Sequence, residues 1–324
     1  MPDLPFLDSF DHYLTADGMQ KWTTGVNIGA GLGRRGTAGA VVAGTGISKT
    51  FDAEYGVLYA GGAFKCPGNS PFKFDNVLSR IELRMQCVGD GRFIVAGSDP
   101  TDPSWFPVWP FTGVTPPILN DRWYYLEMMA QVTPSSYSAI LRINEEVVLN
   151  ETHSLVGRIE THAAWAQLSV QGRGGGVDTW VDDFYVDNAG FFGDVSIDVI
   201  RPNGPYTSQW VPSPTRANWQ NVNDLLPDGD TTVVSSALVN DLDLYTMEDI
   251  PSGLTVKAIQ GIASVRKDHA GLAALKLQYG AAGSALLSDE FFPGAEYTMI
   301  RDGRKDFTTA SAINALTFGQ IRTQ

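Results

Sequence analysis

The chain has 324 residues, of which 43% are hydrophobic and 18% are charged, so it can build hydrophobic cores and is not a disordered chain. Its formal net charge of −13 argues against a nucleic-acid partner, because phosphates require clustered Lys and Arg. Its 34 glycines and 18 prolines favour many short strands over long helices.

The N-terminal stretch MPDLPFLDSFDHY has neither a basic start nor an apolar run, so we expect no signal peptide. The uncharged stretch at 36–48, GTAGAVVAGTGIS, is too short and too rich in glycine to cross a bilayer, so we expect no membrane insertion. Cys66 and Cys87 cannot form a disulfide framework. We expect buried free thiols in a chain made in a cytoplasm, with pairing of the two as the alternative.

Residues 31–36, GLGRRG, match the G-x-G-x-x-G fingerprint of dinucleotide-binding proteins, and Asp52 follows near the spacing of a ribose-binding carboxylate. That fingerprint requires a buried strand before it and a helix after it. Neither the preceding QKWTTGVN nor the following TAGAVVAG fits this requirement. We therefore expect a glycine turn between two edge strands and no cofactor.

Alternation of apolar and polar residues recurs along the chain and predicts antiparallel strands. At 122–132, RWYYLEMMAQV, one face is apolar and the other is too aromatic to be wholly solvated. Further strands are expected at 80–88, at 164–172 and at 178–188, and a hairpin is expected at 138–150 with its turn at residues 144–146. Many short antiparallel strands are typical of a sandwich or jelly roll.

A domain boundary is expected near residues 186–194, VDNAGFFGD, where a strand ends in a small glycine-bearing link. Beyond it, strand patterns recur at 194–200, 231–236, 254–265, 272–280 and 296–303. We therefore predict an all-β protein: a lectin-like antiparallel β-sandwich of the jelly-roll type at 1–192, followed by a second, smaller β domain at 193–324.

Several segments resemble the concanavalin A-like (laminin-G-like) jelly roll of tailed-bacteriophage virion structural proteins. They are DSFDHYLTADGMQKWTT, GRRGTAGAVV, RWYYLEMMAQV with its hairpin, VDTWVDDFYVDN and FFGDVSIDVIRPNG. Their order and spacing carry the resemblance, which implies a structural role in a virion. One departure is Asn144-Glu145-Glu146, where the family has Asn-Gly, so the turn there is expected to be longer or differently shaped.

Carboxylates are the candidates for chemistry. Glycoside hydrolysis needs two of them across a cleft, and Glu127 has no obvious partner, so we expect no enzyme activity. Alternation along 178–188 directs the Asp182 side chain inward, where it must be hydrogen-bonded or bound to a cation. Asp178, Asp182 and Asp183 are weak calcium candidates, and hydrogen bonding to loop amides is the favoured alternative.

Aromatic residues are the candidates for contact with a partner. The stretch DPTDPSWFPVWPFTGVTPP presents its rings among prolines, which suits stacking on sugars, anchoring a protein interface or capping the sandwich core. The Pro-rich stretch of the second domain raises the same question. The interface or glycan-contact candidates are Trp105, Phe106, Trp109, Phe111, Trp210 and Trp219.

The sequence thus favours a non-enzymatic component of a tailed-phage virion, in a tail, fibre, neck or capsid-surface position. It would contact other virion proteins, form a homo-oligomer and reside in the virion after assembly in the host cytoplasm. A carbohydrate-binding host adhesin is the alternative, and a polysaccharide-degrading enzyme is less favoured. We expect no cofactor, with calcium left open.

Overall fold

The computed structural model describes residues 4–11, 13, 21–22, 27–29, 32–36, 38–42, 47–65, 72–75, 82–87, 93–98, 109–110, 119, 122–154, 165–170, 179–280 and 284–324. The chain forms two compact units. We call Phe6–Ile197 the sandwich unit, and Asp198–Gln324 together with Met1–Pro5 the C-terminal unit.

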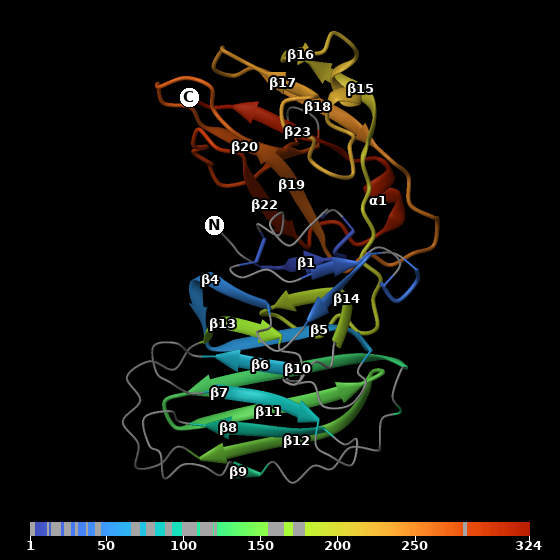
Figure 1. Ribbon diagram of the computed structural model, residues 1–324, viewed down its shortest axis with the longest axis vertical. Helices are drawn as coiled ribbons and strands as arrows, with labels where there is room; N and C mark the ends of the chain where they lie inside the picture. Colours follow the sequence, from blue (N-terminus) through green and yellow to red (C-terminus); the bar gives the residue numbers. More distant parts are fainter. Residues whose placement is uncertain are drawn as a thin grey trace. The chain divides into compact units, whose positions relative to one another are not determined.

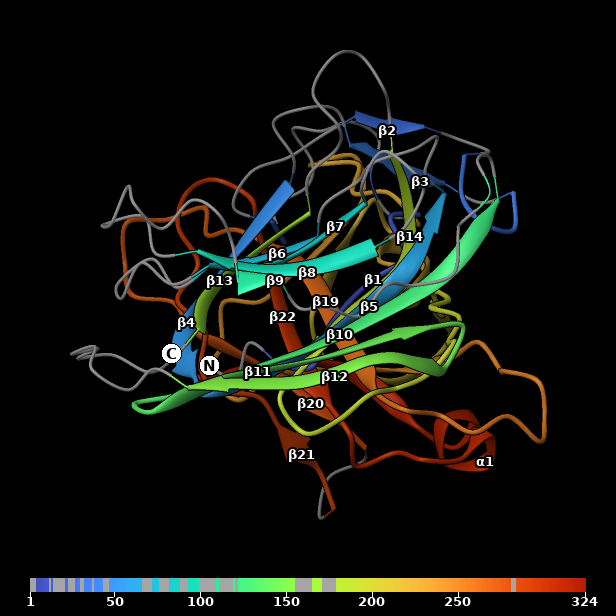
Figure 2. The same cartoon turned by 90° about the horizontal axis from the view of Figure 1, so that it is seen from below.

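Two antiparallel sheets form the sandwich unit (Figure 1). The larger sheet runs in the order β12 (Glu146–Ser154), β11 (Ser136–Ile143), β10 (Trp123–Thr133), β5 (Val57–Lys65), β14 (Thr179–Asp187), β3 (Gly39–Val42) and β2 (Asn27–Gly29), with β1 (Phe6–Asp8) also paired to β14. The smaller sheet runs in the order β4 (Ile47–Tyr55), β13 (Trp165–Val170), β6 (Phe72–Asp75), β7 (Glu82–Cys87), β8 (Phe93–Ser98) and β9 (Trp109–Pro110). In Figure 2, β10–β12 and β6–β9 lie in separate layers of the sandwich.

Side chains that alternate along β10 form the sandwich core. Leu126, Met128 and Val132 are buried on the inner face, as the alternation of 122–132 predicts. Trp165 of β13 is also fully buried, and its Nε1 donates a hydrogen bond to the Ala130 carbonyl at 3.0 Å. A buried indole N–H needs such an acceptor, so this bond ties the two sheets together as well as filling the core.

A buried carboxylate organises the start of the sandwich unit. Asp8 accepts hydrogen bonds from the Tyr13 hydroxyl and the Trp22 indole, both at 2.7 Å, and from the Phe10 amide at 2.9 Å. The ring of Trp22 packs against Phe184 of β14, with centroids 5.3 Å apart. Phe10, Tyr13 and Trp22 are therefore held around one buried carboxylate beside the sheet.

The glycine motif forms the predicted turn. Strands β2 and β3 pair antiparallel at the edge of the larger sheet, with Gly29 opposite Gly39, and the 32–36 turn lies between them. Gly36 has φ +79° and donates its amide to the Gly33 carbonyl at 3.2 Å. A Cβ on Gly39 would lie 2.9 Å from the Gly33 nitrogen, so glycine at 39 permits close backbone contact in this turn.

The C-terminal unit is also built from antiparallel strands. Its five-stranded sheet runs in the order β15 (Pro202–Ser208), β18 (Leu242–Met247), β23 (Thr317–Arg322), β20 (Leu275–Tyr279) and β21 (Leu286–Leu287). Two ribbons accompany it: β16 (Val211–Ser213) with β17 (Val233–Ser235), and β19 (Ile259–Val265) with β22 (Thr298–Arg304). Its helices are short: the 3-10 helix η3 (Asn218–Asn221) and α1 (Ala310–Asn314), which is capped by Thr309.

The predicted fold class is confirmed: an all-β chain with a lectin-like antiparallel sandwich followed by a second β unit. The strands predicted at 231–236, 254–265, 272–280 and 296–303 are present as β17, β19, β20 and β22. Residues 194–200 form no strand, contrary to our expectation. Their alternation has another cause, because Val195 and Ile197 pack against the larger sheet as an irregular segment.

The division of the chain differs from the predicted boundary at residue 192. The sandwich unit extends to Ile197, since backbone amides up to that residue bond to its side chains. Residues at the N-terminus group with the C-terminal unit: the Pro5 carbonyl accepts a hydrogen bond from Gln260 Nε2 at 3.2 Å. Of the cysteines, Cys87 lies in β7 and Cys66 lies outside the described residues.

Candidate functional site

A β-bulge in β14 sets the geometry of the candidate site. Asp182 pairs with Ala63 and Tyr185 with Gly61, so β14 advances by three residues while β5 advances by two. Asp183 adopts φ +49° within the bulge. The extra residue breaks the alternation of side chains.

The bulge changes which face Asp182 occupies. Phe184 faces the core, whereas Tyr185 packs with Ala63 and Tyr125 on the outer face of the larger sheet. Because Asp182 is opposite Ala63, its side chain is also on the outer face. Asp182 is buried and hydrogen-bonded, as predicted, but it lies on the outer face and not in the sandwich core, because strict alternation does not hold across the bulge.

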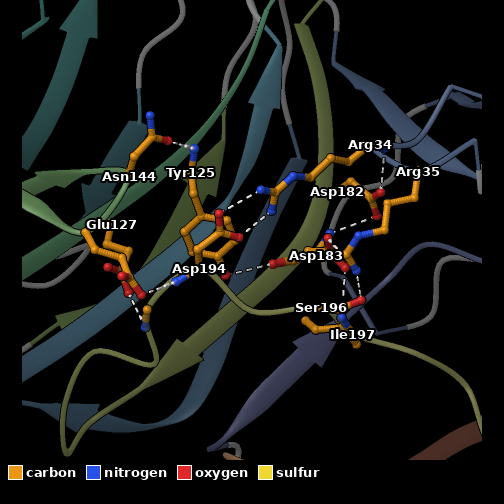
Figure 3. A network of polar contacts seen from close by, with 12 residues as sticks. Arg34, Arg35, Tyr125, Glu127, Asn144, Asp182, Asp183, Asp194, Ser196 and Ile197 are labelled. Carbon is orange, nitrogen blue, oxygen red and sulfur yellow. Dashed lines mark hydrogen bonds and ion pairs between the residues drawn. The ribbon is translucent and has the colours of Figure 1, made fainter. Parts of the chain in front are cut away.

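Residues 189–197, which we call the strap, cross this outer face after β14 ends (Figure 3). The ring of Phe192 stacks on Tyr185 with centroids 4.4 Å apart, and Phe191 meets Tyr59 edge-on at 4.9 Å. The strap therefore covers the face of β10 that the sequence pattern indicated was too aromatic to be wholly solvated.

Glu127 is the central carboxylate under the strap, and its side chain has no exposed surface. Its Oε1 accepts hydrogen bonds from the Tyr185 hydroxyl at 2.5 Å and the Gly193 amide at 2.8 Å. Its Oε2 lies 2.9 Å from Nη1 of Arg142, whose guanidinium also stands over the Phe191 ring. Burial raises the pKa of Tyr185 above its ordinary value, and the Glu127 charge raises it further, so this hydroxyl remains a donor.

The β11–β12 hairpin supplies a second carboxylate. Ile143 pairs with Glu146, so the turn consists of Asn144 and Glu145, both at positive φ (47° and 69°). This is the geometry that Asn-Gly usually adopts, so the departure from the family pattern leaves the turn short. Glu145 Oε1 accepts a hydrogen bond from the Asp194 amide at 3.1 Å. A glycine would adopt the positive φ of Glu145 with less strain, but it could not make this contact.

The strap contains two described glycines, Gly190 and Gly193, and only at Gly193 would an added side chain collide with the hairpin. Gly193 has φ +85°, and a Cβ on it would lie 2.5 Å from Glu145 Oε1. Gly190, the other strap glycine, has open space around its would-be Cβ. The strap therefore requires glycine at 193 and tolerates a side chain at 190.

Asp182 and Asp183 hold two backbone segments. Asp182 accepts hydrogen bonds from the amides of Arg34 (2.7 Å) and Asp183 (2.8 Å). Asp183 Oδ1 accepts from the Ile197 amide at 2.8 Å, and its Oδ2 is buried, accepts no hydrogen bond from the described residues and lies 3.9 Å from Arg35 Nη1. Burial raises the pKa of Asp183 to about 7, against the lowering effect of the nearby amide and arginines.

The two arginines of the 32–36 turn complete the network. Nη1 and Nη2 of Arg34 donate to the two oxygens of Asp194 at 2.5 and 2.7 Å, and Arg35 contacts the Ser196 hydroxyl. Tyr125 links this side to the Glu127 side, since its hydroxyl donates to the Asp183 carbonyl at 3.2 Å. Figure 3 shows these groups as one continuous set around the strap.

The structure thus joins Glu127, Asp182 and Asp183 in one network, which the sequence did not link. Arg142 could have been found from the hairpin, because it is directly opposite Glu127 in the β10–β11 register. Arg34 and Asp194 are 160 residues apart, and no local pattern connects them. Asp182 and Asp183 accept hydrogen bonds from backbone amides, as expected from the favoured alternative to calcium binding.

The remaining site predictions stay predictions. Asp178, Trp105, Phe106 and Phe111 lie outside the described residues, and Trp109 is described only as a backbone position in β9. Within the described part of the chain, no group of three or more His, Cys, Asp or Glu side chains is arranged to hold a metal ion.

The two C-terminal tryptophans are both half-buried. Trp210 donates from Nε1 to the Asp241 carbonyl at 3.1 Å, and Trp219 lies in η3. Asp243 fixes the same loop: it accepts from the amides of Gln209 and Trp210 at 2.7 and 2.9 Å. It also accepts from Asn218 Nδ2 at 2.6 Å and the Tyr245 hydroxyl at 2.9 Å.

No family profile and no curated protein sequence matches the chain. Among solved structures, it is similar to the Crh5 transglycosylase in complex with NAG (15% identity, 57% of this chain and 84% of that chain covered, TM-score 0.37). It is also similar to the Caenorhabditis elegans galectin LEC-6 (10%, 46% and 95%, 0.31) and to a glycosyl hydrolase family protein from Mycobacterium fortuitum (14%, 56% and 98%, 0.37).

No helix in the described part of the chain has the length and apolar character needed to span a membrane.

Proposed function

We propose that the chain is a non-enzymatic structural component of a tailed-phage virion that acts through protein–protein contacts. The observation that supports the non-enzymatic part is the burial of Glu127 under the strap, where Oε1 accepts two hydrogen bonds and Oε2 pairs with Arg142. A general acid or base must reach its substrate, and a glycosidase needs two carboxylates facing a shared cleft. Here the carboxylates of the outer face hold backbone amides instead.

The virion part of the proposal is supported by the order and spacing of the jelly-roll segments in the sequence. Large apolar side chains exposed on the C-terminal unit are available to neighbouring chains, because burying them between subunits is favourable. The most exposed of them are Leu272 (77%), Leu238 (66%), Val211 (65%), Phe292 (62%) and Tyr206 (55%). In this proposal the protein is made in the host cytoplasm, assembles as a homo-oligomer with other virion proteins and needs no cofactor.

Mass spectrometry of purified particles tests this function. The proposal expects the chain in each particle at a fixed copy number that fits a symmetric assembly. Its absence from particles of the host-propagated phage would contradict the proposal. A parallel assay of wild type and Glu127→Gln on host polysaccharide should detect no hydrolysis by either, whereas hydrolysis by wild type alone would support the enzyme instead.

A carbohydrate-binding adhesin is the second candidate. The backbone of Trp109 lies in β9, the terminal strand of the smaller sheet as described. Aromatic rings in such a position suit stacking on sugar rings. A glycan array separates the two functions: the structural role predicts no hit, and a hit abolished by Trp109→Ala would favour the adhesin.

A further inference from the structure

Asp183 differs from the other carboxylates that hold the strap. Glu127 Oε2 and Asp183 Oδ2 are both buried and accept no hydrogen bond from the described residues, but Glu127 Oε2 forms a close ion pair with Arg142 Nη1 at 2.9 Å. Only 5% of the Asp183 side chain is exposed, and the nearest cation, Arg35 Nη1, is 3.9 Å away. A buried carboxylate oxygen in this situation is costly when it carries a charge.

The species that best satisfies this oxygen is a proton. A divalent cation at Oδ2 would stand beside the guanidinium of Arg35 and close to that of Arg34, which would repel it. A proton adds no net repulsion, because it neutralises the carboxyl group. Oδ1 can continue to accept the Ile197 amide in the protonated state.

We propose that Asp183 makes the strap a proton-sensitive clasp, which docks most firmly on the larger sheet when this carboxyl group is protonated. The proposal is independent of the proposed function. Charged and titratable groups face Asp183 from each neighbouring element: Asp182 from β14, Arg34 and Arg35 from the 32–36 turn, Asp194 from the strap and Tyr125 from β10. Asp182 and burial oppose ionisation, and the arginines favour it only in part.

The direction of the pH effect follows from linkage. The pKa of Asp183 is about 7 with the strap docked, against an ordinary value of 3.8 when the group is exposed. The docked state therefore binds more protons between these values. The contribution of Asp183 to the docking equilibrium constant of the strap is largest below pH 4. It falls by roughly tenfold per pH unit between about 4 and 7 and is constant above 7.

Amide hydrogen exchange of peptides covering residues 189–197 tests the clasp, using the full chain at pH 5 to 8 with correction for the intrinsic pH dependence of exchange. Wild type should lose protection as pH rises to about 7. Asp183→Asn should remove this dependence, because its amide stays neutral and Asn tolerates the positive φ at this position. Glu146→Gln, at an exposed position of the neighbouring hairpin, is the matched control and should behave as wild type.

A second variant keeps the test decisive if Asp183→Asn fails to fold. Arg35→Gln removes a charge that favours ionisation, so the loss of protection should extend to higher pH than in wild type. A pH-independent strap in wild type, or the same pH dependence in Asp183→Asn as in wild type, would overturn the proposal. So would an unchanged or lower transition pH in Arg35→Gln.

Discussion

Both units use a buried carboxylate to hold an irregular backbone segment, but the two carboxylates differ in how many hydrogen bonds they accept. In each, a buried carboxylate holds the backbone of an irregular segment: Asp243 holds the loop at residues 209–210, and Asp183 holds the end of the strap. Asp243 accepts four hydrogen bonds shared between its two oxygens. Asp183 has one oxygen that accepts none from the described residues. We infer that a buried carboxylate whose two oxygens both accept hydrogen bonds fixes a loop at any pH at which it is charged. A carboxylate with one oxygen that accepts none makes the docking of its segment depend on pH.

The largest effect is expected from Asp243→Ala in the C-terminal unit. The substitution leaves two amides, an Asn218 amide group and the Tyr245 hydroxyl without their buried acceptor. We expect a loss of about 3–5 kcal/mol in the free energy of unfolding of this unit, measured by chemical denaturation. The exposed Asp268→Ala is the control and should change it by less than about 0.5 kcal/mol. Similar losses for both variants would contradict the role given to Asp243.

Glu127→Gln should have the next largest effect. The neutral amide can accept the Gly193 amide, but it leaves the Arg142 charge uncompensated beside it. We expect a loss of about 2–3 kcal/mol in the stability of the sandwich unit, with faster exchange in the strap. Recovery of stability in the double variant Glu127→Gln, Arg142→Met would locate the loss in this pair. A single variant as stable as wild type would show that the buried pair does not hold the strap.

Gly193→Ala should lower the free energy of unfolding by about 1–2 kcal/mol, because alanine is strained at φ +85° and its Cβ would contact Glu145. Gly190→Ala is the matched control in the same strap and should leave stability unchanged or slightly improved. Thermal unfolding of both variants measures the difference. Equal effects at the two glycines would mean that the strap does not lie as described.

Glu145→Gly should have the smallest effect. Glycine relieves the backbone strain at φ 69° but removes the acceptor of the Asp194 amide, so the two changes should offset to within about 0.5 kcal/mol. The expected signature is local: the Asp194 amide should exchange faster while global stability is nearly unchanged. A global loss above about 1 kcal/mol would show that the hairpin depends on Glu145 itself.

Much of the fold could be predicted from the sequence, because alternation is a local signal. The burial of Leu126, Met128 and Val132 follows directly from the pattern of 122–132. The turn between two edge strands at the glycine motif could be predicted from its flanking residues alone. The bulge at Asp182 and Asp183 could not be anticipated, since one extra residue reverses the face of every side chain on one side of it.

The site was less predictable because its contacts join distant segments. Residues 194–200 have the alternation of a strand, but the amides of Gly193, Asp194 and Ile197 bond to side chains. The polar partners of those amides, Glu127, Glu145 and Asp183, come from three different elements. Sequence alternation indicates that a segment is half-buried, and it does not tell which groups satisfy its backbone.

Site-resolved amide hydrogen exchange of the wild-type chain at pH 6 tests most directly whether buried carboxylates hold the strap. If they do, the amides of Gly193, Asp194 and Ile197 should exchange at least about 100-fold more slowly than in an unstructured peptide. Exchange of these three amides at the unstructured rate, with β10 and β14 still protected, would contradict the account.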